Sequence, residues 1–359
     1  MREWEFEYMK DKKPLKIAVI GCGLIANARH LPTYKRIKNV EVCAVCDVNE
    51  TIAKKTATDF GISNVYADVS KMLSVEEPDI IDICVPPQVH TSVALEAIEN
   101  NCNVIMEKPM ALKTSDCDLM LNAARKKGVK LCVNHNYLFY HPFIEAKKLI
   151  ADGAIGDFVG MRIFLSTPKP DMIDLKDHWY HKLPGGVIGE TGPHVTYMSQ
   201  AFLKNIHNVD IYAKKFLDHP WAPFDEFRLE YEGDNGFSSV ILSYMRNCWT
   251  ANVEIFGTEA ELHLDFNNML VIRHQLKELS YMPLARSSMS TISQIMGGTA
   301  SNVFNVITGK QKVGTDVIIE RFVDSILNDT PLPVTGDDGR ETVRVMEMIV
   351  NGYHEKYGA

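Results

Sequence analysis

The feature that most constrains the fold is a short apolar strand that runs directly into a glycine-rich turn, in the segment KIAVIGCGLIA. Gly21 permits a tight turn, and Gly23 lets the backbone approach a pyrophosphate without a side chain in the way. Ala26 is small enough for the following helix to pack close to the strand. That helix opens at Leu24 and Ile25, where unpaired N–H groups and the helix dipole favour a bound anion. The segment therefore predicts a cradle for the phosphates of a dinucleotide.

A second apolar strand, residues 40–46, ends in Asp47, at the distance where an acidic side chain meets the ribose hydroxyls of an adenosine. A carboxylate at this place repels a 2′-phosphate, so NAD is favoured over NADP as the cofactor. The alternative is a doubly wound domain with a chance glycine turn. The order of strand, turn, helix, strand and acid argues against that alternative.

The length of 359 residues exceeds what one hydrophobic core usually holds, so we expect two domains. We place a charged N-terminal extension at 1–13, an NAD(P)-binding domain at 14–137, and a substrate-binding and oligomerisation domain at 138–359. The formal net charge of -8 argues against binding to nucleic acid or to an anionic membrane, since both require a basic face. No apolar stretch follows a basic N-terminal region, which predicts a cytoplasmic protein.

Seven of the eight cysteines lie in the first 132 residues, mostly in apolar strands or helices, where a thiol behaves as a small hydrophobe. Cys43 and Cys46 have CxxC spacing, but they lie along a predicted strand rather than in the turn that a redox or zinc pair needs. Free thiols in such numbers indicate a reducing compartment.

Residues 14–137 alternate continuous apolar strands with helices, which is typical of an α/β domain with a parallel, doubly wound Rossmann sheet covered on both faces. Ligands of such sheets bind outside the carboxyl ends of the strands. The loops at these ends carry the residues Gly21, Asp47, Pro86, Lys108 and Asn134.

From about residue 140 onward, strands predominate. Phe227, Leu229 and Tyr231 alternate with charged side chains, which indicates a sheet with one wet face. We expect an α+β domain with a large, open, mostly antiparallel sheet, whose exposed face is a candidate interface for a homodimer or homotetramer. Residues 287–309 carry no charge but are too rich in Ser, Thr, Asn and Gly for a membrane span. They predict a helix that packs on a partner, lies near a pocket, or forms a buried scaffold.

Lys108 follows a predicted parallel strand, in the segment Glu107-Lys108-Pro109, next to where a nicotinamide would lie. An amine beside the positively charged oxidised ring, with less water around it, is favoured in its neutral form and can accept a proton from a hydroxyl. The alternative is a surface lysine in a loop. The position at the ligand-binding edge of the sheet favours the catalytic interpretation.

Glu190 and His194 lie four residues apart in a predicted helix, so the two side chains can face one ligand. The carboxylate can bind a hydroxyl or orient the imidazole, and the histidine can transfer a proton near neutral pH. His178 and His181 lie upstream, but their spacing matches no known zinc motif, so we expect no metal. A structural histidine remains an alternative to a substrate contact.

A third polar segment, Asn134-His135-Asn136-Tyr137, follows the last strand of the first domain. Its side chains could line a small-molecule pocket near the domain boundary, or could equally cap the helix that begins at Pro142.

Taken together, these residues resemble the Gfo/Idh/MocA family of glucose-fructose oxidoreductases, inositol dehydrogenases and rhizopine catabolism proteins. The resemblance runs from about Leu15 to the end of the chain and is carried by the motifs Gly21-x-Gly23-x-x-Ala26, Asp47, Pro86-Pro87-x-x-His90, Glu107-Lys108-Pro109, Gly153-x-x-Gly156, Gly185-Gly186, His194 and Pro331-Leu332-Pro333-Val334-Thr335-Gly336. It implies that Lys108 is the catalytic lysine, that the bond from Lys108 to Pro109 is cis, and that His194 is the pocket histidine. It also implies that the cofactor is bound by the segments that carry Gly21, Gly23, Leu24, Ile25, Asp47, Pro86, Pro87, His90, Glu107 and Lys108.

The chain departs from the family pattern at two positions near His194. Glu190 stands where the family usually has aspartate, and Tyr197 stands where an aspartate commonly lies three residues after the histidine. The arginine often found near Leu138 is also absent from this sequence.

The leading hypothesis is an NAD-dependent dehydrogenase acting on a secondary alcohol of a sugar, sugar derivative or cyclitol. Lys108 and His194 would share proton transfer, and Glu190 would bind a substrate hydroxyl. One alternative is a glycosidase or lyase that uses transient oxidation followed by elimination. Another is a sugar-nucleotide sensor without turnover.

Overall fold

The computed structural model describes residues 13–275 and 278–358, which form two compact units. One unit contains the described residues through Asn134 together with Thr315–Val343, and the other contains His135–Gly314 and the described residues from Arg344 onward. The predicted extension at 1–13 lies outside the described residues except for Lys13. The boundary between 137 and 138 stays a prediction, and the structure groups Thr315–Val343 with the first unit.

The first unit is built around a six-stranded parallel sheet with the strand order β3-β2-β1-β4-β5-β6. Its strands are β1 (Leu15–Ile20), β2 (Val40–Cys46), β3 (Asn64–Tyr66), β4 (Ile80–Ile83), β5 (Asn103–Met106) and β6 (Leu131–Val133). The central strands are buried along most of their length, as the continuous apolar runs predict for a sheet covered on both faces. The predicted Rossmann architecture is therefore confirmed.

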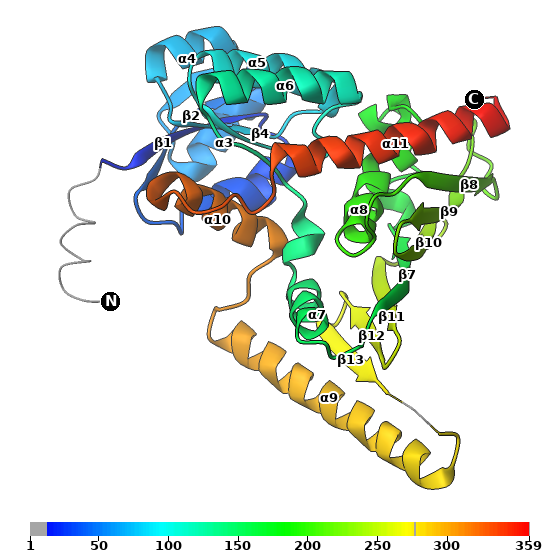
Figure 1. Ribbon diagram of the computed structural model, residues 1–359. Helices are drawn as coiled ribbons and strands as arrows, with labels where there is room; N and C mark the ends of the chain where they lie inside the picture. Colours follow the sequence, from blue (N-terminus) through cyan, green and yellow to red (C-terminus); the bar gives the residue numbers. More distant parts are fainter. Residues whose placement is uncertain (1–12, 276–277, 359) are drawn as a thin grey trace, which may run out of the picture. The chain divides into compact units, whose positions relative to one another are not determined.

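Helices cover both faces of this sheet. They are η1 (Ala26–His30), α2 (Leu31–Tyr34), α3 (Glu50–Phe60), α4 (Val69–Glu76), η2 (Pro87–Val89), α5 (His90–Glu99), α6 (Thr114–Lys127) and α10 (Gly314–Asn328). Figure 1 shows α4, α5 and α6 over one face and α10 over the other. Local sequence sets the helix ends. The Asn49 side chain accepts hydrogen bonds from the first N–H groups of α3, and Gly61 ends that helix in a left-handed conformation.

The second unit is built around a seven-stranded mixed sheet with the strand order β13-β12-β11-β7-β10-β9-β8. Its strands are β7 (Phe158–Ser166), β8 (Asn208–Lys214), β9 (Glu226–Gly233), β10 (Gly236–Ser243), β11 (Thr250–Gly257), β12 (Glu261–Asp265) and β13 (Leu270–His274). Only β7 and β10 pair in parallel, and the other neighbours are antiparallel. The prediction of a mostly antiparallel open sheet is confirmed.

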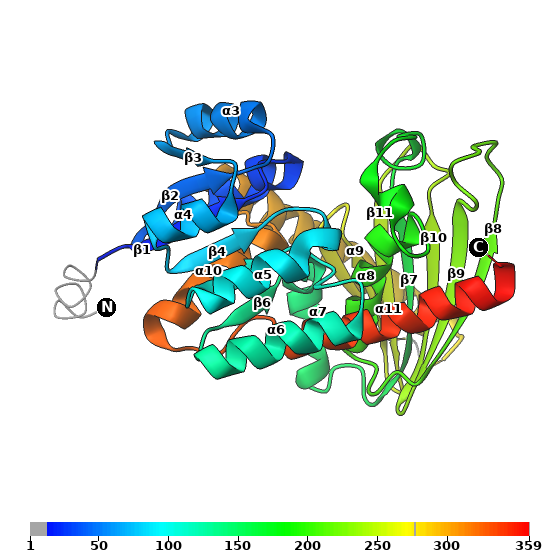
Figure 2. The same cartoon turned by 90° about the horizontal axis from the view of Figure 1, so that it is seen from above.

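The helices of the second unit are η3 (Asn136–Phe139), α7 (His141–Ala151), η4 (Lys169–Asp171), η5 (Trp179–Lys182), α8 (Ile188–Gln200) and α9 (Tyr281–Ile307). They include α7, which matches the helix predicted from Pro142, and three short helices that the sequence did not predict. The last helix, α11 (Gly336–Tyr357), begins in the first unit and ends in the second. Figure 2 shows the strands β8, β9 and β10 running beside one another.

The two faces of the second sheet differ in burial. Phe227, Leu229 and Tyr231 of β9 are at most 1% exposed, as their alternation with charged residues predicts. On the opposite face, Phe237 of β10 is 60% exposed and Arg162 forms an ion pair with Glu254. This outer face, defined by the outward side chains of β7, β10 and β11, mixes apolar and charged groups.

Helix α9 forms from the uncharged segment that the sequence left open between three interpretations. None of its described side chains is buried, so the interpretation as a buried scaffold helix is wrong. The helix lies along β13 and presents apolar side chains such as Met289, Met296 and Phe304 at more than half exposure. Across residues 13–275 and 278–358, no helix has both the length and the apolar character that a membrane span requires.

Candidate functional site

The glycine turn after β1 has the geometry that the motif predicts. Gly21 has a φ of +93°, and a Cβ there would lie 2.6 Å from the carbonyl oxygen of Cys84, so no other residue fits without a shift. By contrast, a Cβ on Gly23 would meet nothing within 4 Å, which leaves the outer side of the turn open. A closed inner side and an open outer side fit the close approach of a pyrophosphate to the backbone.

The helix that follows the turn opens at Leu24 and Ile25, and its first turns are π-helical over Ala26–His30. Leu24 is 86% exposed and Ile25 is half-buried, so both lie at the surface beside the turn. Ala26 is completely buried, as expected for a small residue at the contact between helix and strand.

Asp47 lies directly against the glycine turn. Its Oδ2 accepts a hydrogen bond of 2.8 Å from the backbone N–H of Cys22, and its Oδ1 accepts one of 2.8 Å from that of Asn49. These bonds hold the carboxylate at the carboxyl end of β2, beside the turn at the end of β1. The turn and the carboxylate together fit a dinucleotide with its pyrophosphate on the turn and its ribose at Asp47.

The loops after β4 and β5 are tied together by His90. The imidazole is completely buried, with Nδ1 2.9 Å from the carbonyl oxygen of Pro109 and Nε2 2.8 Å from that of Val85. Burial lowers the pKa of His90. The ring nitrogens of this predicted cofactor residue therefore face the protein, and His90 shapes the loop that carries the exposed Pro86 and the buried Pro87.

Lys108 lies at the carboxyl end of β5, and β5 pairs with β4, the neighbour of β1. The peptide bond from Lys108 to Pro109 is cis, which confirms the expectation from the resemblance. The Lys108 side chain is half-buried. Burial alone would raise the pKa of the adjacent Glu107, but the hydrogen bond and charge of His30, and then the charge of Lys108, lower it overall.

A buried polar network that the sequence did not predict includes Glu107, the residue directly before Lys108. Nδ1 of His30 is 2.7 Å from Oδ2 of Asp82, and Nε2 is 3.0 Å from Oε1 of Glu107. Tyr34 donates its hydroxyl to Asp82 at 2.9 Å, and Asn134 donates its amide to Glu107 at 2.6 Å. Because a carboxylate only accepts hydrogen bonds, both ring nitrogens of His30 must carry protons.

The His30 imidazole is therefore a buried cation between two carboxylates. Burial by itself lowers the pKa of His30, but the charges and hydrogen bonds of Asp82 and Cys84 together outweigh it, so that the pKa is raised well above its ordinary value. The resulting triad fixes Glu107, the residue directly before Lys108. We call His30, Asp82 and Glu107 the buried triad from here on.

Cys84 lies against this triad, with its thiol 3.4 Å from Nδ1 of His30 and 3.5 Å from Oδ1 of Asp82. Among the described residues, His30, Asp82 and Cys84 are the one set of three metal-type ligands that lie close together. Burial raises the pKa of the Cys84 thiol. Hydrogen bonds hold the three side chains together. Cys84 is buried, as the sequence predicts, but it also has polar contacts that were not predicted.

Glu190 and His194 both lie on α8, one helical turn apart, as predicted. Two successive glycines, Gly185 and Gly186, with φ values of +77° and +65°, form the turn that leads into this helix. Glu190 lies in the first turn of α8, where the helix dipole stabilises a carboxylate. Burial raises the pKa of Tyr180, and the nearby charge of Glu190 adds to that rise.

His194 is held by aromatic and polar neighbours within the second unit. Its Nδ1 lies 2.6 Å from the hydroxyl oxygen of Tyr197. That hydroxyl donates to Oδ1 of Asn136 at 2.9 Å and accepts the backbone N–H of Tyr137 at 3.2 Å. The Tyr137 ring lies edge-on to the imidazole, and the His135 ring stacks on Tyr197. His135, Asn136 and Tyr137 therefore organise the surroundings of His194, and that they line a small-molecule pocket stays a prediction.

His178 and His181 have buried ring nitrogens without a hydrogen-bond partner in the part of the chain that the structure describes. These atoms are Nδ1 of His178 and Nε2 of His181. Burial lowers the pKa of both histidines, which favours neutral rings. Neutral imidazoles near the Glu190 charge can hydrogen-bond an uncharged polar ligand.

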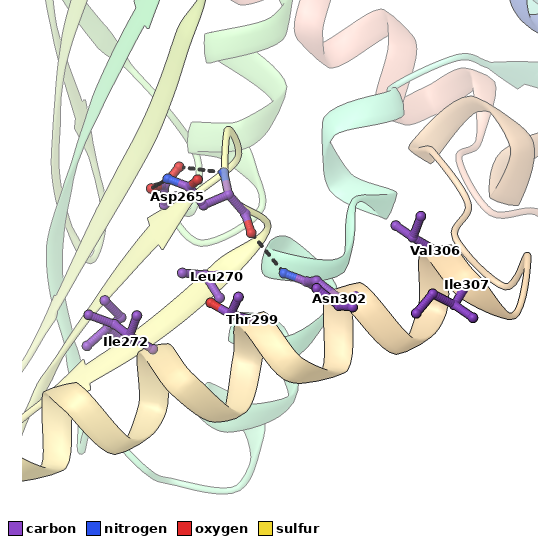
Figure 3. Close-up of a pocket in the computed structure, with 10 residues that line it drawn as sticks. Asp265, Leu270, Ile272, Thr299, Asn302, Val306 and Ile307 are labelled. Atoms are coloured by element: carbon purple, nitrogen blue, oxygen red, sulfur yellow. Dashed lines mark hydrogen bonds between the residues drawn. The ribbon is translucent and has the colours of Figure 1, made fainter.

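A separate pocket of about 580 Å³ lies between α9 and the strands β12 and β13 (Figure 3). Asn302 points from α9 to the turn between these strands, where it donates to the carbonyl oxygens of Asn268 and Met269 at 2.8 and 3.1 Å. The lining is otherwise largely apolar and includes Leu270 and Ile272. None of the site residues predicted from the sequence lines this pocket.

The sequence matches two protein-family models. Residues 15–135 match the model described as the oxidoreductase family with an NAD-binding Rossmann fold. Residues 143–263 match the GFO/IDH/MocA C-terminal domain. The two matches lie in order along the chain and together span well over half of it.

Curated relatives match parts or most of the chain. D-glucoside 3-dehydrogenase of Escherichia coli is 31% identical over 156 residues, which cover 44% of this chain and 43% of that protein. An uncharacterized oxidoreductase of Bacillus subtilis, YrbE, is 25% identical over 340 residues, which cover 93% of this chain and 92% of that protein. The alignment to the Escherichia coli protein thus spans less than half of its length, whereas the Bacillus alignment is nearly complete.

Among solved structures, levoglucosan dehydrogenase in complex with NADH has a TM-score of 0.79. The superposition covers 95% of this chain and 97% of that structure at 18% identity. At this identity the likeness establishes the fold, and it extends over both units.

Proposed function

Since the chain belongs to the GFO/IDH/MocA family of oxidoreductases, with their NAD-binding Rossmann fold, we propose that it is an NAD-dependent dehydrogenase of a sugar, sugar derivative or cyclitol. The reaction is a hydride transfer between the nicotinamide and a secondary alcohol or ketone. NAD supplies the hydride acceptor in the oxidative direction.

One observation carries the proposal: the glycine turn with Asp47 and a half-buried lysine lie at the carboxyl ends of strands of one parallel sheet. Gly21 and Asp47 provide the cradle at β1 and β2, and Lys108 follows β5 on the other side of β4. Ligands of open parallel sheets bind at this edge. A basic side chain beside the ring-binding end of such a cradle is suited to accept the proton of the reacting hydroxyl.

The proposed proton acceptors are Lys108 and His194. Lys108 accepts the proton of the reacting hydroxyl during oxidation. His194 shares the proton transfer, and Glu190 accepts a hydrogen bond from a substrate hydroxyl. Glu107, fixed by the buried triad, keeps the Lys108 backbone in place.

Support for an uncharged, hydroxyl-rich substrate comes from the second unit and from a relative. The neutral rings of His178 and His181 and the carboxylate of Glu190 are suited to hydrogen-bond hydroxyl groups. The Escherichia coli relative carries the name of a glucoside dehydrogenase. Asp47 supports NAD rather than NADP, because its charge repels a 2′-phosphate.

The test is a panel of free sugars, glycosides, cyclitols and nucleotide sugars, assayed by the absorbance of reduced nicotinamide with NAD and with NADP. We expect turnover with NAD for at least one neutral member. The Lys108→Ala variant should lose about 10²–10⁴-fold in kcat, the range that one acid–base group contributes. NAD binding, measured by calorimetry, should persist in this variant.

The matched control is Lys113→Ala, which removes an exposed lysine from the same segment after β5. It should leave kcat within about twofold of the wild type, since exposed substitutions away from a site have small effects. Absence of turnover across the panel, or full activity in Lys108→Ala, would contradict the proposal.

The proposal also includes a homodimer or homotetramer formed through the outer face of the second sheet, and a cytoplasmic location. Phe237 on that face is 60% exposed, which supports an interface. All eight cysteines are free, and seven are buried, which supports a reducing compartment.

A further inference from the structure

We propose that Tyr197 and Asn136 are positioning residues that hold His194 in the tautomer with its proton on Nδ1. The tautomer itself is a property of the second unit and is independent of the reaction. Its consequence for turnover rests on the proposed function.

The hydroxyl of Tyr197 takes part in three hydrogen bonds. A phenolic oxygen has one proton to donate and two lone pairs that accept. The backbone N–H of Tyr137 can only donate, so it occupies one lone pair, at 3.2 Å. The hydroxyl proton points to Oδ1 of Asn136, at 2.9 Å.

The third neighbour of this oxygen is Nδ1 of His194, at 2.6 Å. Since the only hydroxyl proton is already donated to Asn136, the bond to His194 can form only if Nδ1 carries a hydrogen. In a neutral imidazole the proton is then absent from Nε2, which is left as the acceptor. The arrangement thus selects the tautomer in which Nε2 can take a proton.

The surroundings keep this arrangement rigid. Tyr197 is 2% exposed, and the His135 ring stacks on it with a centroid distance of 4.3 Å and an angle of 14° between the planes. Tyr137, whose backbone N–H fixes the phenol oxygen, also packs edge-on against the His194 ring at 4.9 Å. A side chain held on both sides can impose the tautomer of its neighbour without being charged.

The hydroxyl of Tyr197 thus provides a hydrogen-bond acceptor for Nδ1 of His194, although no acidic residue lies three positions after this histidine. A carboxylate at that position would accept the Nδ1–H bond and add a negative charge near the ring. Tyr197 accepts the same bond as a neutral group. Tyr197 thereby selects the tautomer of His194 without placing a negative charge beside the imidazole.

The experiment is nitrogen NMR of protein labelled with ¹⁵N-histidine, in which the His194→Gln variant identifies the His194 resonances. In the wild type at a pH where the ring is neutral, we expect Nδ1 to be protonated and Nε2 to be unprotonated. Tyr197→Phe should show a mixture of both tautomers. Asn136→Leu should shift His194 toward the Nε2–H form, because the hydroxyl proton is released to point at Nδ1.

Tyr231→Phe is the matched control, because it removes a completely buried hydroxyl that bonds Thr196, on the same helix as His194, at 3.1 Å. Its His194 spectrum should equal that of the wild type. An Nε2–H tautomer in the wild type, or an unchanged spectrum in both Tyr197→Phe and Asn136→Leu, would overturn the proposal. Because the wild-type spectrum is itself decisive, the test does not depend on the folding of either variant.

The kinetic readout applies if the proposed dehydrogenase activity is found. Tyr197→Phe should lower kcat about tenfold and change KM less than twofold, the effect of losing one hydrogen bond that aligns the acceptor. Tyr231→Phe should change neither. A KM effect without a kcat effect would argue against positioning of His194. If no activity is found, the proposed function fails while the NMR test of the tautomer stands.

Discussion

Replacing His30 by leucine should strongly destabilise the first unit. The imidazole is completely buried, as is Asp82, and the side chain of Glu107 is 14% exposed. Leucine fills much of the same volume but leaves two carboxylates without their shared cation. Removing one partner of a buried charge pair costs about 3–5 kcal/mol, which for a unit of this size corresponds to a fall of roughly 6–20 °C in Tm.

The contribution of His30 to the stability of the wild type should depend on pH with a definite sign. Because the pKa of His30 is raised in the folded protein, its contribution is fully present below the ordinary histidine pKa of about 6.5 and declines as the pH rises toward the folded value. Above about pH 6.5, loss of this contribution should therefore lower the free energy of unfolding of the wild type by about 1.4 kcal/mol per pH unit. The lowered pKa of Glu107 acts only at acidic pH, outside this range.

The assay is urea unfolding of both proteins at several values between pH 6.5 and 8.5, followed by fluorescence and circular dichroism. His90→Leu is the control, because it removes another completely buried histidine, whose pKa is lowered. Its stability difference from the wild type should stay constant above pH 6.5. A loss of less than 1 kcal/mol in His30→Leu at pH 6.5, or a wild-type free energy of unfolding that does not fall as the pH rises above 6.5, would refute the description of His30 as a buried cation.

Two further predictions follow from the glycine turn and the outer face of the second sheet. Gly21→Ala should lower the free energy of unfolding by about 2–5 kcal/mol, because Gly21 has a φ of +93° and a Cβ there would lie 2.6 Å from a carbonyl oxygen. Gly23→Ala should change the free energy of unfolding by less than about 1 kcal/mol, but calorimetry should show weaker NAD binding. Equal stability losses in the two variants would contradict this division. Sedimentation equilibrium should find an oligomer for the wild type and a shift toward monomer for Phe237→Glu, and a wild-type monomer would exclude the proposed interface.

The architecture could be predicted because its determinants are local in the sequence. Continuous apolar runs such as residues 80–83 and 103–106 identify strands buried on both faces, and alternation in β9 identifies a strand with one wet face. The glycine turn could be located because the motif fixes the positions of its glycines. The structure shows why Gly21 is required, since a side chain there would collide with the carbonyl group of Cys84. The exposure of α9 could not be predicted, because an uncharged helix is compatible with burial and with a partner surface alike.

The arrangement around His194 could be predicted only in part. The spacing of Glu190 and His194 on one helix was sufficient to place them on one face. Helical spacing also allows Tyr197, three residues on, to reach the imidazole. The roles of Asn136 and Tyr137 depend on η3 packing against α8, which is a tertiary contact that no spacing in the sequence indicates.

The buried triad illustrates where sequence reasoning stops. Asp82 stands inside the buried strand IIDI, and a carboxylate in such a place must be paired, so the sequence alone requires a partner. It does not identify that partner, because the chain contains 12 histidines and 38 lysines and arginines. His30 is 52 residues away from Asp82 and 77 from Glu107, and only the strand order brings the three together. An acidic residue in an apolar strand therefore indicates that a buried polar network exists. Only the fold shows that this network includes Glu107, the residue beside Lys108.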